Sequence, residues 1–187
     1  MAKAKLTPSV EHIHGQVGSF VYKSRYGVNI IAQKPDHVTQ PNTPAQQAAK
    51  GSFTDAADYA KGAMANPQLH AAYMAEAKIQ KSSPNAVAIK DWMTAPTVKL
   101  VDLSHYSKQV GDVIYVKAID DFQVTGVHVS IEDSAHAAIE SGAAVFDMPS
   151  NAWKYTVTVD ATAKGTVTVT ASAMDNPGNV GTLSATK

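Results

Sequence analysis

Carboxylate and amide side chains gather at the ends of predicted strands in the second half of the chain. Oxygen atoms of this kind are the ligands that calcium prefers. The same residue types are common turn formers, because Asp and Asn side chains hydrogen-bond the local backbone. Since the sequence holds no dense acidic loop of the EF-hand type, the turn interpretation is preferred and calcium binding stays open. The residues concerned are Asp120, Asp121, Glu132, Asp133, Asp175, Asn176 and Asn179.

A second possible metal site lies near the N-terminus, where His12 and His14 are separated by one residue. This spacing would place both imidazoles on one side of a strand, an arrangement that some metal sites use. No third ligand follows nearby, and His37 lies in a predicted linker. We therefore expect surface histidines, and we assign no metal site and no cofactor.

The motifs of common catalytic sites are missing from the sequence. It contains no Cys, which removes disulfides, thiol catalysis and Cys-based zinc sites together. It also has no Gly-x-Ser-x-Gly elbow, no phosphate-cradling loop and no pair of carboxylates in an aromatic cleft. We expect a protein that is not an enzyme, and we assign no catalytic residue.

The first third of the chain predicts a β-hairpin with strands over 17–23 and 28–33, which are rich in β-branched and aromatic residues. Two strands alone are marginally stable in water, so the hairpin needs cover. That cover comes either from the helix that follows in the same chain or from the strand edge of a neighbouring subunit. The sequence leaves both alternatives open.

Three helix starts follow, at Thr43-Pro44, Asn66-Pro67 and Ser83-Pro84, each with a capping residue before a proline. They predict helices over 44–65, 67–80 and 84–93. The first carries a stripe of alanines, which lets a partner approach closely but buries little area. The other two helices should place their apolar residues in a core: Leu69, Ala72, Tyr73, Ile79, Val87, Ala88 and Trp92.

From residue 98 onward, helical periodicity gives way to short strands separated by Gly, Asp, Asn and Pro. This pattern predicts an all-β sandwich with Trp153 and Tyr155 at its centre. The expected fold class is therefore α+β, with a hairpin and helical domain over 1–94 and a β-sandwich domain over 95–187. The predicted strands cover 98–103, 113–118, 124–132, 143–146, 155–159, 166–173 and 181–185.

Several segments of this second half resemble bacterial immunoglobulin-like domains. The resemblance implies a sandwich fold but no single function, since such domains serve adhesins, virions and enzyme accessories alike. An Ala-x-Asp-x-x-Gly-Asn ending is frequent in that group. The segments are Val110-Gly111-Asp112, 114–121 with Val124, Val127, Val129 and Ile131, 153–156, and Ala171 to Asn179 with Asp175 and Gly178.

The first half resembles a poorly characterised group of bacterial and phage-associated proteins. That group shares a Gly-x-x-Gly hairpin and an Asn-x-x-Thr-Pro-Ala-Gln-Gln helix start with a later aromatic residue. This chain has no residue between its Asn and Thr, and Lys50-Gly51 stands where Arg is usual. The resemblance implies no activity. The matching residues are Gly15, Gly18, Phe20, Tyr22, 42–47 and Phe53.

Charge is distributed unevenly along the chain, although the net charge is zero. Residues 1–35 hold five Lys or Arg against one Glu, and residues 95–187 hold six Lys against ten Asp or Glu. This asymmetry either has no consequence at a solvated surface or lets neighbouring copies attract each other head to tail. Five cations without an aromatic platform do not indicate nucleic-acid binding.

These features favour a non-enzymatic structural protein, a self-assembling subunit of an extracellular fibre, filament or virion surface. The alternative is a carbohydrate- or cell-surface-binding module displayed on an immunoglobulin-like domain. We expect a homo-oligomer or polymer that does not span a membrane and leaves the cell without a classical signal peptide. The predicted assembly interface comprises Val17, Phe20, Tyr22, Val28, Ile30 and Phe53.

Overall fold

The computed structural model describes residues 2–4, 14–25, 28–34 and 41–187. The chain divides into two compact units, Met1–Gln47 and Ala48–Lys187. The expected α+β class is confirmed, since three helices accompany antiparallel sheets. The expected domain boundary between residues 94 and 95 stays a prediction.

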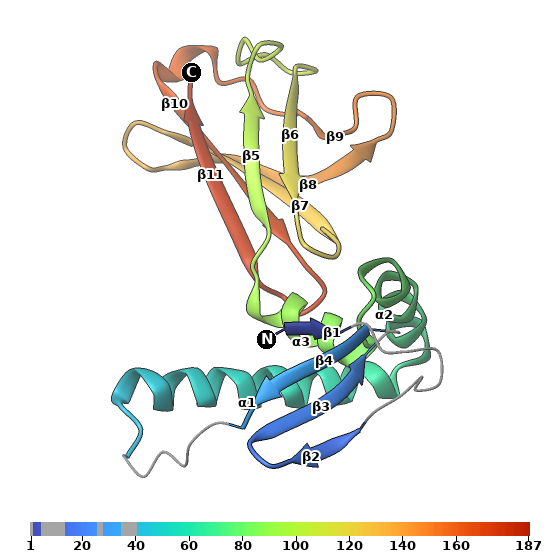
Figure 1. Ribbon diagram of the computed structural model, residues 1–187. Helices are drawn as coiled ribbons and strands as arrows, with labels where there is room; N and C mark the ends of the chain where they lie inside the picture. Colours follow the sequence, from blue (N-terminus) through green and yellow to red (C-terminus); the bar gives the residue numbers. More distant parts are fainter. Residues whose placement is uncertain (1, 5–13, 26–27, 35–40) are drawn as a thin grey trace. The chain divides into compact units, whose positions relative to one another are not determined.

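The first unit contains a four-stranded antiparallel sheet with the strand order β1-β4-β3-β2 (Figure 1). The expectation of one continuous strand over 17–23 is wrong, because a turn at Gly18-Ser19 separates β2 from β3. Gly18 has a φ of 58°, a left-handed conformation that glycine adopts without steric cost. The strands are β1 Ala2–Ala4, β2 Gly15–Val17, β3 Phe20–Arg25 and β4 Val28–Gln33.

The three predicted helices begin at the expected prolines. At the first start, the Thr43 hydroxyl oxygen accepts from the Gln46 N–H at 3.3 Å, and the Gln46 side-chain oxygen accepts from the Thr43 N–H at 2.8 Å. This reciprocal pair is a capping box. Asn66 and Ser83 cap the other two starts with their side-chain oxygens. The helices are α1 Pro44–Ala65, α2 Pro67–Gln80 and α3 Pro84–Met93.

A small core joins the helices of the second unit. Tyr73 and Ala77 on α2 are buried with alanines of α1 and with Val87 and Ala88 of α3. The expectation that Ile79 belongs to this core is wrong, since its side chain is 76% exposed. Tyr73 and Ala77 are four residues apart and share one helix face, whereas Ile79 follows Ala77 by two residues and points away from that face.

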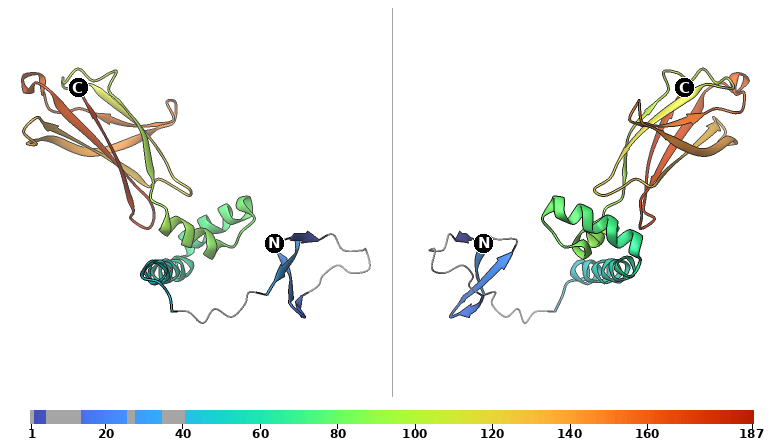
Figure 2. Two further views of the ribbon diagram at one scale, coloured as in Figure 1. Left: turned by 60° about the vertical axis from the view of Figure 1, so that its left-hand side comes forward. Right: turned by 90° about the vertical axis from the view of Figure 1, so that its right-hand side faces the viewer.

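The remainder of the second unit is a β-sandwich of seven antiparallel strands with the order β11-β10-β7-β8-β9-β6-β5. Strand β8 belongs to both layers, because Ala138–Ala144 pairs with β7 and Val145–Asp147 pairs with β9. Figure 2 shows the two layers from further directions. The strands are β5 Thr97–Asp102, β6 Val113–Ile119, β7 Gly126–Asp133, β8 Ala138–Asp147, β9 Ala152–Thr156, β10 Val167–Met174 and β11 Val180–Thr186.

The sandwich core consists of inward-facing aliphatic residues from both layers, among them Ile114, Val129 and Ile131, with Tyr155 buried beside them. Trp153, which was also expected at the centre, is half-buried at the edge of the core. The two layers approach closely where β11 begins, since a Cβ added to Gly181 would lie 1.7 Å from the carbonyl oxygen of Pro96. Only glycine permits this approach between the two backbones.

Candidate functional site

Among the described residues, three carboxylate side chains cluster where α3 meets the sandwich. Carboxylate oxygens of Asp91, Asp120 and Asp175 all lie within 4.8 Å of one another. Asp91 belongs to α3, Asp120 follows β6, and Asp175 follows β10. Asp91 and Asp175 are buried and Asp120 is half-buried. We name these three residues the acidic junction.

The turn between β10 and β11 positions one side of the junction. The Asp175 side chain accepts from the N–H of Gly178 at 2.8 Å and of Asn179 at 2.6 Å. Gly178 has a φ of 93°, which favours glycine at this position. The turn therefore holds Asp175 through its own backbone, as expected of an Asx residue.

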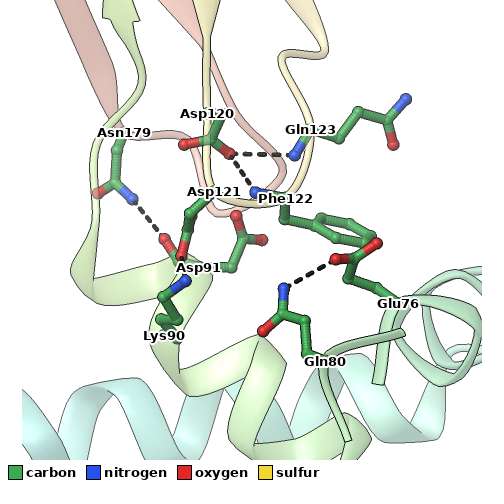
Figure 3. A network of polar contacts seen from close by, with 9 residues as sticks. All are labelled: Glu76, Gln80, Lys90, Asp91, Asp120, Asp121, Phe122, Gln123 and Asn179. Atoms are coloured by element: carbon green, nitrogen blue, oxygen red, sulfur yellow. Dashed lines mark hydrogen bonds and ion pairs between the residues drawn. The ribbon is translucent and has the colours of Figure 1, made fainter. Parts of the chain in front are cut away.

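Asn179 links this turn to the end of α3. Its side-chain amide donates to the carbonyl oxygens of Trp92 at 3.1 Å and Asp91 at 3.4 Å, and to the Asp175 carboxylate at 2.8 Å. Carbonyl groups in the last turn of a helix lack intrahelical donors. Asn179 supplies one, and so it joins the helix to the sandwich (Figure 3).

The loop after β6 forms the other side of the junction. The Asp120 carboxylate accepts from the N–H groups of Phe122 at 3.3 Å and Gln123 at 3.1 Å. Its neighbour Asp121 forms an ion pair with Lys90 of α3 at 3.2 Å. The aromatic ring of Phe122 stacks on Tyr73 with a centroid distance of 4.4 Å. This loop therefore contacts the helices through both charged and apolar groups.

A chain of hydroxyl groups reaches Asp91 from the helical core. The Tyr73 hydroxyl donates to the Asp91 carboxylate, and the hydroxyls of Tyr59 and Tyr73 lie 2.9 Å apart. Because the Tyr73 hydroxyl uses its hydrogen in the bond to Asp91, the Tyr59 hydroxyl must be the donor in the bond between the two tyrosines. All three groups lie between α1, α2 and α3, so the acidic junction is anchored in the helical core.

Burial raises the pKa of Asp91 to about 7, against the opposing effect of the Tyr73 hydrogen bond and with added repulsion from Asp120, Asp175 and Asp121. Burial also raises the pKa of Asp121, which the hydrogen bond from Lys90 opposes. One buried oxygen on each of Asp91, Asp120 and Asp121 has no hydrogen-bond partner among the described residues. The junction therefore holds more negative charge than the described groups around it neutralise.

Sequence reasoning found part of this site. Four of the seven residues considered as oxygen ligands, Asp120, Asp121, Asp175 and Asn179, lie at the junction. Sequence reasoning missed Asp91, although a carboxylate in the last turns of a helix is unfavourable next to the negative end of the helix dipole and was a detectable signal.

Three other candidate ligands have different surroundings. Asp133 caps a turn through the N–H groups of Ala135 and Ala137, and Glu132 lies 3.6 Å from His136. Asn176 is in the β10–β11 turn, and its buried side-chain nitrogen has no partner among the described residues. For Asp133, the turn interpretation is therefore confirmed.

A pocket of about 560 Å³ adjoins the acidic junction, because Asp120 lines it together with its neighbour Phe122. Phe146 and Trp153 line the pocket and meet edge to face with a centroid distance of 5.4 Å. Trp153 pairs directly with Val116 of β6, which is fully buried, so both residues are on the inner face of their layer. The pocket is therefore an opening at the margin of the sandwich core, of a size typical for small ligands.

The predicted assembly residues fall into three groups. Val17, Phe20 and Tyr22 share one face of the first unit's sheet, because Val17 pairs with Phe20 and alternate residues of β3 point the same way. Val28 and Ile30 occupy the opposite face, as their pairing with Arg25 and Lys23 shows. Phe53 lies on α1 and is 53% exposed. Their role in assembly stays a prediction.

Of the histidines considered as metal ligands, His12 and His37 lie outside the described residues, and His14 precedes β2. Within the described parts of the chain, none of the helices combines the length and hydropathy that a membrane-spanning helix needs.

Comparison with known proteins gives little further information. No protein-family model matches this chain, and no curated protein matches it. A solved structure described as a tetra-tandem repeat in the extending region of a large adhesion protein is similar at 23% identity, with a TM-score of 0.36. The match covers 50% of this chain and 24% of that chain, so this chain spans about a quarter of its length.

Proposed function

We propose that this protein is a non-enzymatic structural subunit that assembles with further copies of itself into an extracellular fibre, a filament or a virion surface. In this proposal the sheet of the first unit contacts the sandwich of the next copy. The observation that carries the proposal is the apolar face of that sheet, where Val17 is 65% exposed and Phe20 is 48% exposed. Tyr22 and Ile31 extend the same face as a cross-strand pair.

Charge complementarity supports a second copy as the partner. The segment that includes the sheet, residues 1–35, has a net charge of +4, and residues 95–187 have a net charge of −4. Opposite charges on two surfaces steer their encounter and fix their relative orientation. A head-to-tail contact of this kind closes into a ring or continues as an open filament, depending on its rotation.

The strand arrangement of the sandwich supports an immunoglobulin-like assignment within the same proposal. Strands β5, β6, β9 and the end of β8 form one layer, and β7, β10 and β11 form the other with the start of β8. Immunoglobulin domains divide their strands in the same way, with A, B, E and D in one sheet and C, F and G in the other. Such domains commonly serve as rigid building blocks of surface structures.

Light scattering across protein and salt concentrations, with negative-stain electron microscopy, tests the assembly. Phe20→Asp should dissolve the assemblies, because it places a charge in the proposed apolar contact. Ile79→Asp is the matched control, since Ile79 is 76% exposed on α2 and belongs neither to that sheet nor to the sandwich. High salt should weaken the wild-type assembly. A wild-type protein that stays monomeric at all protein and salt concentrations would contradict the proposal.

A second candidate function is carbohydrate binding, which the aromatic pocket of the sandwich favours. Phe146 is exposed and Trp153 half-buried, whereas Tyr106 and Tyr155 are buried in the core. Aromatic rings beside carboxylate and amide groups, here Asp120 and Gln123, suit the apolar face and hydroxyl edge of a sugar. A glycan array with wild type and Phe146→Ala tests this function, and saturable binding by a monomer that needs Phe146 would favour it over assembly.

A further inference from the structure

The acidic junction concentrates negative charge without enough positive charge to balance it. With Asp121, four carboxylates surround the end of α3, and the ion pair that the structure describes there is the one between Lys90 and Asp121. Groups of like charge held this close in a partly buried site repel strongly, because water screens them poorly. A cation at the centre would relieve this repulsion.

The end of α3 adds to the same negative potential. Asp91 lies in the last turn of α3, where the partial negative charge of the helix dipole resides. The carbonyl oxygens of Asp91 and Trp92 also face this region, since both accept from the Asn179 amide. A helix end and three carboxylates therefore converge on one small volume.

A second and independent observation is that carboxylate oxygens are buried here without partners. Asp91 is fully buried, and one of its oxygens accepts from Tyr73 while the other has no partner among the described residues. Asp120 likewise has one buried oxygen without a partner. Buried polar atoms in native proteins nearly always bind something, so these oxygens point to a missing ligand.

The donor atoms and their spacing identify the ion. Oxygen donors alone favour hard cations such as calcium and magnesium. Oxygens on opposite sides of a calcium ion lie up to about 5 Å apart, whereas magnesium draws them to about 4.2 Å. The three junction oxygens lie within 4.8 Å of one another, a spacing that the coordination sphere of one calcium ion spans.

We propose that Asp91, Asp120 and Asp175 bind one calcium ion, which joins the end of α3 to the loops after β6 and β10. The ion would hold the helices against the sandwich, in addition to the contacts of Asn179 and of Phe122. This inference is independent of the proposed assembly. It assigns a role to the Asp91 oxygen that has no partner among the described residues.

Calorimetric titration of the EDTA-treated full-length protein with calcium chloride tests the proposal, together with thermal unfolding at each calcium concentration. We expect one ion per chain and a melting temperature that rises with calcium. Terbium should replace calcium and luminesce on tyrosine excitation, because Tyr73 contacts Asp91. The weakest extracellular calcium modules have dissociation constants of about 1 mM. The titration therefore extends to a calcium concentration of about 10 mM.

Asp120→Asn is the informative variant, because an amide oxygen can still accept from the N–H groups of Phe122 and Gln123. It should weaken calcium binding by more than about tenfold through the loss of ligand charge. In EDTA it should unfold at the same temperature as wild type or higher, since one repulsive charge is gone. Asp160→Asn is the matched control, as Asp160 also accepts from a backbone N–H two residues ahead but is exposed.

Three outcomes would overturn the proposal. Wild type that shows neither heat nor a shift in melting temperature up to about 10 mM calcium has no site of the expected strength. An equal calcium response in Asp120→Asn would place binding elsewhere. An equal response of wild type to magnesium would remove the assignment to calcium.

Discussion

The two sheets of this protein are both antiparallel, yet they bury their side chains very differently. Along β10 of the sandwich, residues alternate between fully buried and more accessible positions. Along β4 of the first unit, residues are exposed at the ends and half-buried between them. A sandwich layer buries one face against the other layer, whereas a lone four-stranded sheet has no second layer of strands. The first unit is therefore the part of the chain that gains most from a partner.

The largest expected effect compares a core residue of the sandwich with an exposed residue of the first unit's sheet. Ile131→Ala should lower the free energy of unfolding of the second unit by about 2–5 kcal/mol, because Ile131 is fully buried in the sandwich core. Phe20→Ala should change the free energy of unfolding of the first unit by less than about 0.5 kcal/mol, because Phe20 is 48% exposed. Urea unfolding, monitored by circular dichroism, measures the free energy of unfolding of both variants. A large loss of stability in Phe20→Ala would show that this sheet is as tightly packed as the sandwich.

The next effect tests how closely the sandwich layers approach. Gly181→Ala should cost about 3 kcal/mol, since its Cβ collides with the Pro96 backbone and β11 must move. Gly126→Ala in β7 is the control, because a Cβ there meets nothing within 4 Å. Differential scanning calorimetry of the two variants provides the measurement. Equal melting temperatures would mean that β11 can move away from Pro96 at little energetic cost.

A smaller effect concerns the hydroxyl chain of the helical core. Tyr73→Phe should cost about 1–2 kcal/mol, because it leaves an oxygen of the buried Asp91 without its donor. Tyr59→Phe should cost less, since Tyr59 is half-buried and its hydroxyl bonds the Tyr73 hydroxyl rather than the buried Asp91. Chemical denaturation measures the loss in free energy of unfolding for each of the two variants. The reverse order would contradict the direction of donation described above.

The smallest effect lies at the start of α1. Thr43→Ala removes the side-chain acceptor for the Gln46 N–H and should cost about 0.5–1 kcal/mol, locally. Hydrogen exchange should accelerate in the first turn of α1, while the melting temperature of the sandwich stays constant. A global loss of stability would show that the helix start supports both units.

Local signals were enough to predict most elements. Thr43, Asn66 and Ser83 mark their helices correctly, because capping involves neighbouring residues only. Five of the seven sandwich strands appear within two residues of their expected ends, whereas β8 begins five residues earlier than expected and β9 shares only residues 155–156 with its expected range. The turn at Gly18-Ser19 was missed because it divides an apolar run that favours a single strand. Strand β1 was also missed, since Ala2–Ala4 carries no β-branched residue.

The candidate site was predictable only in part. Asp120 and Asp175 stood out as oxygen-bearing residues at loop ends, but their spacing along the chain does not show that they meet. Asp91 lies 29 residues before Asp120 in a helix, where a carboxylate normally faces solvent. Convergence of this kind depends on how α3 docks against two loops, and a linear pattern does not contain that information.

The sequence by itself determined the α+β class, the three helix starts and the seven strands of the sandwich, because capping, alternation and turn residues act over a few neighbouring positions. Only the tertiary structure decided that Asp91, Asp120 and Asp175 share one buried volume and that Phe146 and Trp153 line a pocket beside it. The physical reason is that burial and charge clustering depend on packing between distant segments. These properties do not follow from periodicity within any one segment.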